Sequence, residues 1–131
     1  MTAASSRVRL LVVEDNPANQ QLALALLSRA GYDVALVASA REARFAIAAE
    51  LPDAILMDVE LPDQNGLALT RELRQDERTA GVPIIALTAN AMRGDEELAY
   101  SAGCAGYITK PIDMRHFREV LTTVLSPNVE Q

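Results

Sequence analysis

Four short apolar runs in this sequence each end in side chains that can bind a metal ion or a phosphoryl group. Glu14 and Asp15 follow the first of these runs, and Asp58, Thr88 and Lys110 follow three others. Two carboxylates about 5 Å apart repel by roughly 3 kcal/mol at an effective dielectric constant near 20, so three gathered anions require a cation. Oxygen ligands of this kind favour Mg²⁺, with Mn²⁺ as a substitute, and Lys110 supplies a further positive charge.

The predicted nucleophile is Asp58. A carboxylate held between a divalent ion and a lysine can attack phosphorus, because both cations neutralise charge that builds on the transferred phosphoryl oxygens. The Thr88 hydroxyl can donate a hydrogen bond to one of those oxygens. This chemistry requires a fold that brings the ends of four apolar runs together.

The sequence alternates apolar runs with amphipathic segments that carry helix start and stop signals. Asn16 and Pro17 begin the first helix and Gly31 ends it, and Ser39 caps the second. We expect strands over 8–13, 32–37, 53–57, 83–87 and 106–108, and helices over 17–30, 39–50, 66–75, 93–102 and 114–125.

This alternation predicts an α/β fold with a parallel sheet and helices on both faces. Five strands with this rhythm favour a single doubly wound, flavodoxin-like sheet of order 2-1-3-4-5, in which the first and third strands are neighbours. Ligands of such sheets bind outside the carboxyl ends of the strands, where the strand order reverses. The predicted site residues all lie at the carboxyl ends of their strands, and therefore at that edge of the sheet.

The composition is that of one acidic domain. A chain of 131 residues has room for one continuous core, and its net charge of −6 without a run of Lys or Arg disfavours nucleic acid and anionic membrane surfaces. It has a single cysteine, no secretory signal and no apolar run near the roughly 20 residues that cross a bilayer. We expect a domain over 7–126, short flexible tails at 1–6 and 127–131, and a cytoplasmic location.

Four motifs resemble the receiver domain of bacterial response regulators, and the resemblance covers 8–125. They are LLVVEDN, ILMDVELPDQNG, PIIALTANAMRGDE and AGCAGYITKPID. The resemblance implies a chemotaxis-regulator-like fold and a signalling switch that takes a phosphoryl group onto Asp58 from a histidine kinase or a histidine phosphotransfer protein. Such a domain catalyses only its own phosphorylation and dephosphorylation and is not otherwise an enzyme.

The resemblance also implies the metal ligands. Glu14 and Asp15 would hold Mg²⁺, Asp15 directly and Glu14 largely through water. Asp58 would be a ligand as well as the acceptor, and the backbone carbonyl of Glu60 would complete the set. The Glu60 side chain adds a negative charge beside this site.

The resemblance assigns further roles at the fourth and fifth strands. Thr88 and Lys110 would bind the phosphoryl group, and the Lys110–Pro111 peptide bond would be cis. Tyr107 resembles an aromatic switch whose ring moves inward when Thr88 shifts toward the phosphoryl group. Phosphorylation would thereby bias one bistable element of the domain.

Two surfaces are expected to meet partner proteins. The downstream partner would bind the face made by the fourth helix, the fifth strand and the fifth helix, near Tyr100 and Tyr107. The phosphohistidine donor would dock at 16–20 and against Pro111 and Ile112.

Alternatives to this interpretation differ in class. The segment TANAMRGDEE resembles both stand-alone cell-cycle regulators and receivers of hybrid histidine kinases, and a starting Met with a short tail favours the stand-alone form. A Toprim-like metal nuclease would use Glu14, Asp58 and Glu60 but leaves Asp15, Thr88 and Lys110 without roles. A flavin-binding protein would need a hydroxyl-rich or glycine-rich loop after the first strand, where this chain is acidic.

Overall fold

Strands and helices alternate along the whole described part of the chain. The computed structural model describes residues 7–89 and 94–129, with side chains up to position 125, and the expected tail at 1–6 lies outside these ranges. Its elements are β1 (Arg9–Val13), α1 (Pro17–Arg29), β2 (Asp33–Val37), α2 (Ala40–Ala49), β3 (Ala54–Asp58), α3 (Gly66–Gln75), β4 (Ile84–Thr88), α4 (Asp95–Ala102), β5 (Gly106–Thr109) and α5 (Met114–Val129).

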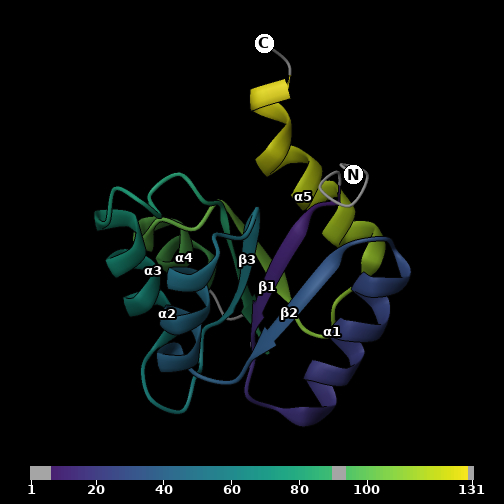
Figure 1. Ribbon diagram of the computed structural model, residues 1–131, viewed down its shortest axis with the longest axis horizontal. Coiled ribbons are helices and arrows are strands. Elements are labelled where there is room, and N and C mark those ends of the chain that lie inside the picture. Colours follow the sequence, from purple (N-terminus) through teal and green to yellow (C-terminus); the bar gives the residue numbers. More distant parts are fainter. Residues whose placement is uncertain (1–6, 90–93, 130–131) are drawn as a thin grey trace.

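The five strands form one parallel sheet of order β2-β1-β3-β4-β5, which confirms the predicted doubly wound, flavodoxin-like fold. Helices α2, α3 and α4 cover one face of the sheet, and α1 and α5 cover the other (Figure 1). The register aligns the strand ends: Val13 pairs with Met57, Asp58 with Leu87, and Thr88 with Thr109. The residues that follow these strands therefore meet at one edge.

Each sheet face has its own apolar core. Alternate strand residues point to opposite faces, so Leu11 joins the cluster under α2, α3 and α4 while Leu10 joins the cluster under α1 and α5. Phe117 is fully buried in the second cluster and meets the Tyr32 ring edge-on at 5.7 Å between centroids. Burying a side chain of this size contributes about 1.5–3 kcal/mol, so α5 is held firmly against the sheet.

Most element boundaries fall within two residues of the expected ones, and the differences have local causes. Tyr32 precedes β2 because its N–H donates to Leu27 O at the end of α1. Helix α4 begins at Asp95, and the expected start at Arg93 lies outside the described residues. Helix α5 continues to Val129, past the expected domain limit at 126. Within the described ranges, no helix combines the length and apolar character needed to cross a bilayer.

Candidate functional site

Three carboxylates meet at the carboxyl edge of the sheet, between β1 and β3. Glu14 and Asp15 follow β1, and Asp58 is the last residue of β3. Each offers a carboxylate oxygen, and the three oxygens lie within 4.8 Å of one another. Glu14 is 2% exposed and Asp58 4%, whereas Asp15 is open to solvent. This is an oxygen-ligand set with a solvent-facing side, as hard divalent cations require.

The ammonium of Lys110 bonds two of these carboxylates. Its Nζ lies 2.9 Å from Glu14 Oε1 and 3.3 Å from Asp58 Oδ2, and its side chain is 13% exposed. The backbone places it there, because Lys110 N donates to Thr88 O at 2.7 Å and so extends the pairing of β5 with β4. Three ionised carboxylates and one ammonium sum to −2, a charge that one divalent cation balances.

The environment shifts the pKa values of Asp58 and Lys110. Burial raises the pKa of Asp58 from 3.8 to about 6, and the charge of Glu14 adds to that rise. The N–H of Glu60, which donates to Asp58 Oδ1 at 2.9 Å, and the Lys110 ammonium act in the opposite direction. Burial lowers the pKa of Lys110, but its bond to Glu14 and the charge of Asp58 outweigh this and leave the pKa raised.

Metal-free protein is expected to lose stability as the pH rises through about 6. Between its ordinary pKa of 3.8 and about 6, Asp58 binds a proton more tightly in the folded than in the unfolded chain. The proton therefore stabilises the fold at low pH, and on the order of 2 kcal/mol is lost once Asp58 ionises. Urea unfolding in EDTA across this pH range measures the loss, and the Asp58→Asn variant should lack it. An identical pH slope in both proteins would contradict the assignment.

A tight loop after β3 frames the Asp58 carboxylate. Glu60 and Asn65 form an isolated bridge across it, and Gly66 N donates to Val59 O at 2.8 Å. A Cβ at Gly66 would overlap the Asp58 carbonyl oxygen, so only glycine lets α3 begin this close to the end of β3.

Sequence reasoning missed the contacts that tie this loop to α2. The Asp63 carboxylate accepts hydrogen bonds from Ala40 N at 2.9 Å and Arg41 N at 3.0 Å and so caps α2 from outside. Arg44 on the next turn of α2 bonds both Gln64 in the loop and Glu72 on α3. The loop that carries Glu60 is thus anchored at two points.

Thr88 and Tyr107 lie on the adjacent strands β4 and β5. Thr88 ends β4 and is 8% exposed, and Tyr107 on β5 pairs with Ala86. The Tyr107 hydroxyl is buried. Burial and the charges of α4 raise its pKa, while interaction with Thr88 lowers it. The Lys110–Pro111 peptide bond is cis.

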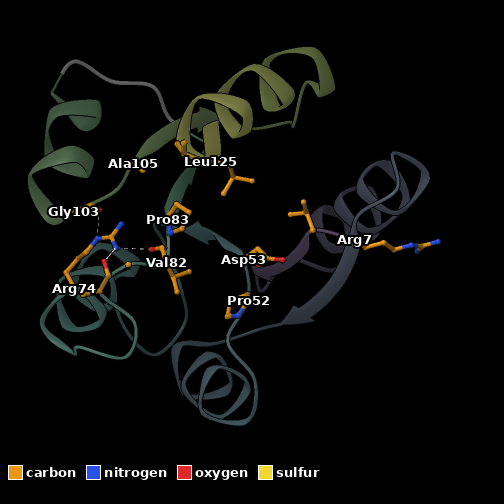
Figure 2. A pocket seen from close by; sticks show the side chains of 13 residues that line it. Arg7, Pro52, Asp53, Arg74, Val82, Pro83, Gly103, Ala105 and Leu125 are labelled. Atoms are coloured by element: carbon orange, nitrogen blue, oxygen red, sulfur yellow. Dashed lines mark hydrogen bonds between the residues drawn. The ribbon is translucent and has the colours of Figure 1, made fainter. Parts of the chain in front are cut away.

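A cavity of about 840 Å³ lies at the opposite, amino edge of the sheet (Figure 2). Pro52, Pro83 and Leu125 line it together with Asp53 and Arg74. Three charged residues line it, and two of them make structural hydrogen bonds: Asp53 accepts from Arg9 N at 2.8 Å, and Arg74 donates to backbone carbonyls, whereas Arg7 is exposed. The arrangement is structural, and the candidate chemistry belongs to the other edge.

Arg74 is expected to contribute strongly to stability. Its guanidinium donates to Gly103 O at 2.7 Å, Ala80 O at 2.6 Å and Val82 O at 2.9 Å, which joins α3 to the turns before β4 and β5 (Figure 2). Arg74→Ala leaves these carbonyls without a donor and should lower the free energy of unfolding by about 1–3 kcal/mol. Arg71→Ala, at an exposed position of the same helix, should change it by less than about 0.5 kcal/mol. Equal effects of the two substitutions in urea unfolding would contradict this role.

The sequence and the fold match known proteins over nearly the whole chain. The sequence profile of the response regulator receiver domain matches residues 10–122. The polar-differentiation response regulator DivK of Brucella ovis is 40% identical over 116 residues, which is 88% of this chain and 94% of that protein.

Solved structures agree with this match. The receiver domain of a sensor histidine kinase from Pseudomonas aeruginosa, with a magnesium ion in its active-site cleft, has a TM-score of 0.83 and 41% identity, covering 92% of this chain and 99% of that one. A chemotaxis protein of Vibrio cholerae has a TM-score of 0.84 and 26% identity, covering 92% and 100%. This chain therefore belongs to the family of response regulator receiver domains, the phospho-accepting switches of two-component signalling.

Proposed function

We propose that Asp58 takes a phosphoryl group from a phosphohistidine donor while Glu14, Asp15 and Asp58 hold Mg²⁺. The observation that carries this proposal is the cluster of three carboxylate oxygens within 4.8 Å, two of whose groups share one lysine. The three carboxylates and the ammonium of Lys110 together carry a charge of −2, which one divalent cation would balance. The magnesium ion in the related Pseudomonas receiver lends support, and the backbone carbonyl of Glu60 would add a ligand.

The transfer requires a nucleophile and compensation of charge. An Asp58 carboxylate oxygen forms a bond to phosphorus as the bond from phosphorus to the donor imidazole nitrogen breaks, and the electron pair leaves with the imidazole. Bound Mg²⁺ supplies Lewis-acid stabilisation of the phosphoryl oxygens. Lys110 already forms an ion pair with Asp58. Its ammonium is therefore close enough to stabilise the negative charge that develops on the phosphoryl oxygens.

The donor would approach across the start of α1 and the turn after β5. Asn19 and Leu22 from α1 line a small cavity of about 10 Å³ together with Pro111 and Ile112, and Glu14 and Lys110 line it as well. Leu22 is 38% exposed, which gives a docking protein an apolar contact beside the acceptor. The family resemblance implies a dock at 16–20 and at Pro111 and Ile112, and we propose the same place for the donor.

The signal would leave through Thr88 and Tyr107. A phosphoryl group on Asp58 would add acceptor oxygens next to the buried Thr88, and Tyr107 on the neighbouring strand belongs to the face formed by α4, β5 and α5. Movement of Thr88 toward the phosphoryl group would change the packing around the Tyr107 ring. The proposed output is a change in protein binding at this face.

Acetyl phosphate with Mg²⁺ tests the acceptor directly. Intact mass measurement should show one phosphoryl adduct in the native protein, and EDTA should prevent it. Mn²⁺ should restore the adduct. Folded protein that binds Mg²⁺ but forms no adduct with acetyl phosphate or with a phosphorylated histidine phosphotransfer protein would reject the proposal.

The proposed chemistry is the same for a stand-alone receiver and for a receiver within a hybrid kinase, and one relative of each kind is about 40% identical to this chain. The Toprim-like alternative used Glu14, Asp58 and Glu60 alone. The observed cluster adds Asp15 and Lys110 to the site, which favours phosphoryl acceptance. Magnesium-dependent cleavage of DNA that is lost in Asp58→Asn would reverse this preference.

A further inference from the structure

Asp15 is the exposed member of the carboxylate cluster, yet its backbone is held on both sides. The peptide bond before it joins Glu14 to Asp15, and the carbonyl of that bond accepts a hydrogen bond from Gln20 Nε2 at 2.6 Å. The peptide bond after it joins Asp15 to Asn16, and the N–H of that bond donates to Glu14 Oε2 at 3.0 Å. Side chains therefore fix both of the peptide planes that flank Asp15.

Gln20 reaches the Glu14 carbonyl from the first turns of α1. Its backbone N–H donates to Asn16 O at 2.9 Å, and the Asn16 side chain caps the helix by accepting from Asn19 N at 3.0 Å. Gln20 is half-buried, whereas Gln21 beside it on α1 is exposed. Most glutamines leave their amide in water, so an amide that turns inward to a carbonyl six positions earlier is a specific contact. Gln20 lies within the segment expected to dock the donor, but its amide faces the carboxylate cluster.

The three carboxylates of the cluster differ in what directs them. Glu14 Oε1 bonds Lys110 Nζ at 2.9 Å, and Asp58 accepts from Glu60 N and from Lys110. Among the described residues, no hydrogen bond or ion pair engages the Asp15 carboxylate. The direction of the Asp15 carboxylate is therefore set by its backbone, and the backbone is set by the two bonds that flank it.

We propose that Gln20 is a positioning residue for the metal site. Its bond to the Glu14 carbonyl fixes the peptide bond before Asp15 and so directs the Asp15 carboxylate toward the oxygens of Glu14 and Asp58. The inference rests on the proposed function, because Asp15 acts here as a ligand of Mg²⁺. A ligand that is fixed before the ion arrives loses less conformational freedom on binding, which raises the affinity for the ion.

Gln20→Met removes the amide donor and keeps an unbranched side chain of similar length. Calorimetric titration of metal-free protein should show Mg²⁺ binding weakened about tenfold, the lower end of the range for replacing a residue that supports a metal ligand. The Mg²⁺ concentration that gives half-maximal phosphoryl uptake from acetyl phosphate should rise by the same factor. Gln21→Met makes the same replacement at the exposed neighbouring position and should change Mg²⁺ affinity by less than about twofold.

Amide exchange tests the contact in the native, metal-free protein without any substitution. In ¹⁵N-labelled protein the bonded side-chain amide proton of Gln20 should exchange with water at least about tenfold more slowly than the side-chain amide protons of Gln21. This measurement needs neither Mg²⁺ nor a phosphoryl donor.

Equal exchange rates of the two glutamines, or equal Mg²⁺ affinities of Gln20→Met and Gln21→Met, would overturn the inference. A role of Gln20 in the stability of α1 alone predicts a change in urea unfolding with unchanged Mg²⁺ affinity of the folded protein, and that result would overturn it too. Native protein that binds Mg²⁺ but forms no adduct rejects the proposed function alone, because the Mg²⁺ affinities of the two variants still test Gln20. Native protein that binds no Mg²⁺ would overturn both.

Discussion

Asp58→Asn is expected to abolish phosphoryl uptake while the fold stays intact. The amide oxygen that replaces the carboxylate is a poor nucleophile, and the other site residues do not compensate, because Glu14 is bonded to Lys110 and Asp15 is exposed at the rim. The rate of adduct formation from acetyl phosphate should fall by at least about a thousandfold, as is usual when a nucleophile is removed. Intact mass under identical donor and Mg²⁺ concentrations measures it.

Asp58→Asn is expected to affect phosphoryl uptake and the stability of the fold in opposite directions. Above about pH 6 the native Asp58 is ionised beside the buried Glu14, so Asp58→Asn relieves repulsion and should make metal-free protein more stable. Added Mg²⁺ should stabilise the native protein more than the variant, because the variant offers one ligand charge fewer. Asp33→Asn, at an exposed position of β2, is the matched control and should change neither property. Normal uptake by Asp58→Asn would show that the acceptor is another residue.

Much of the fold could be predicted from the pattern of apolar and polar residues. Two rules that need no knowledge of tertiary contacts were sufficient. Apolar runs separated by amphipathic segments specify strand and helix, and right-handed crossovers then restrict the sheet to few orders. The strand ends meet at one edge, so Asp15 and Asp58 were predicted to be neighbours although 43 positions separate them, and the observed oxygen distances agree. The local pattern was enough to predict this pair, because the order of strands in the sheet brings the ends of β1 and β3 together.

Pairings between particular side chains could not be predicted from the sequence. Lys110 was expected to offset charge in the cluster, and its shorter contact is to Glu14, at 2.9 Å, whereas Asp58 lies at 3.3 Å. The cap of α2 by Asp63 and the three carbonyl bonds of Arg74 join segments distant in the chain. Such contacts depend on side-chain rotamers and loop paths in the packed molecule, for which no periodic signal exists.

Lys110→Met is expected to weaken the metal-free fold and the chemistry together, while strengthening the binding of Mg²⁺. Lys110 is the only lysine of the chain, and its ammonium is the only cation bonded to Glu14 and Asp58 in the described residues. Methionine keeps the length of the side chain and removes the charge. Two buried carboxylates then face each other without compensation, and the free energy of unfolding should fall by up to about 3 kcal/mol above pH 7.

The pH dependence and the metal dependence distinguish this effect from ordinary loss of packing. The loss should shrink near pH 5, because Asp58 is then protonated and no longer repels Glu14. Mg²⁺ should bind more tightly to Lys110→Met than to native protein, since no ammonium competes for the carboxylates, yet phosphoryl uptake should slow by about a hundredfold or more. Calorimetric titration of Mg²⁺ and intact mass measure the two effects. Arg118→Met removes an equal charge from the exposed face of α5 and should leave both unchanged. Weaker Mg²⁺ binding in Lys110→Met, or a loss of stability independent of pH, would mean that Lys110 serves the fold and not the charge balance of the acceptor.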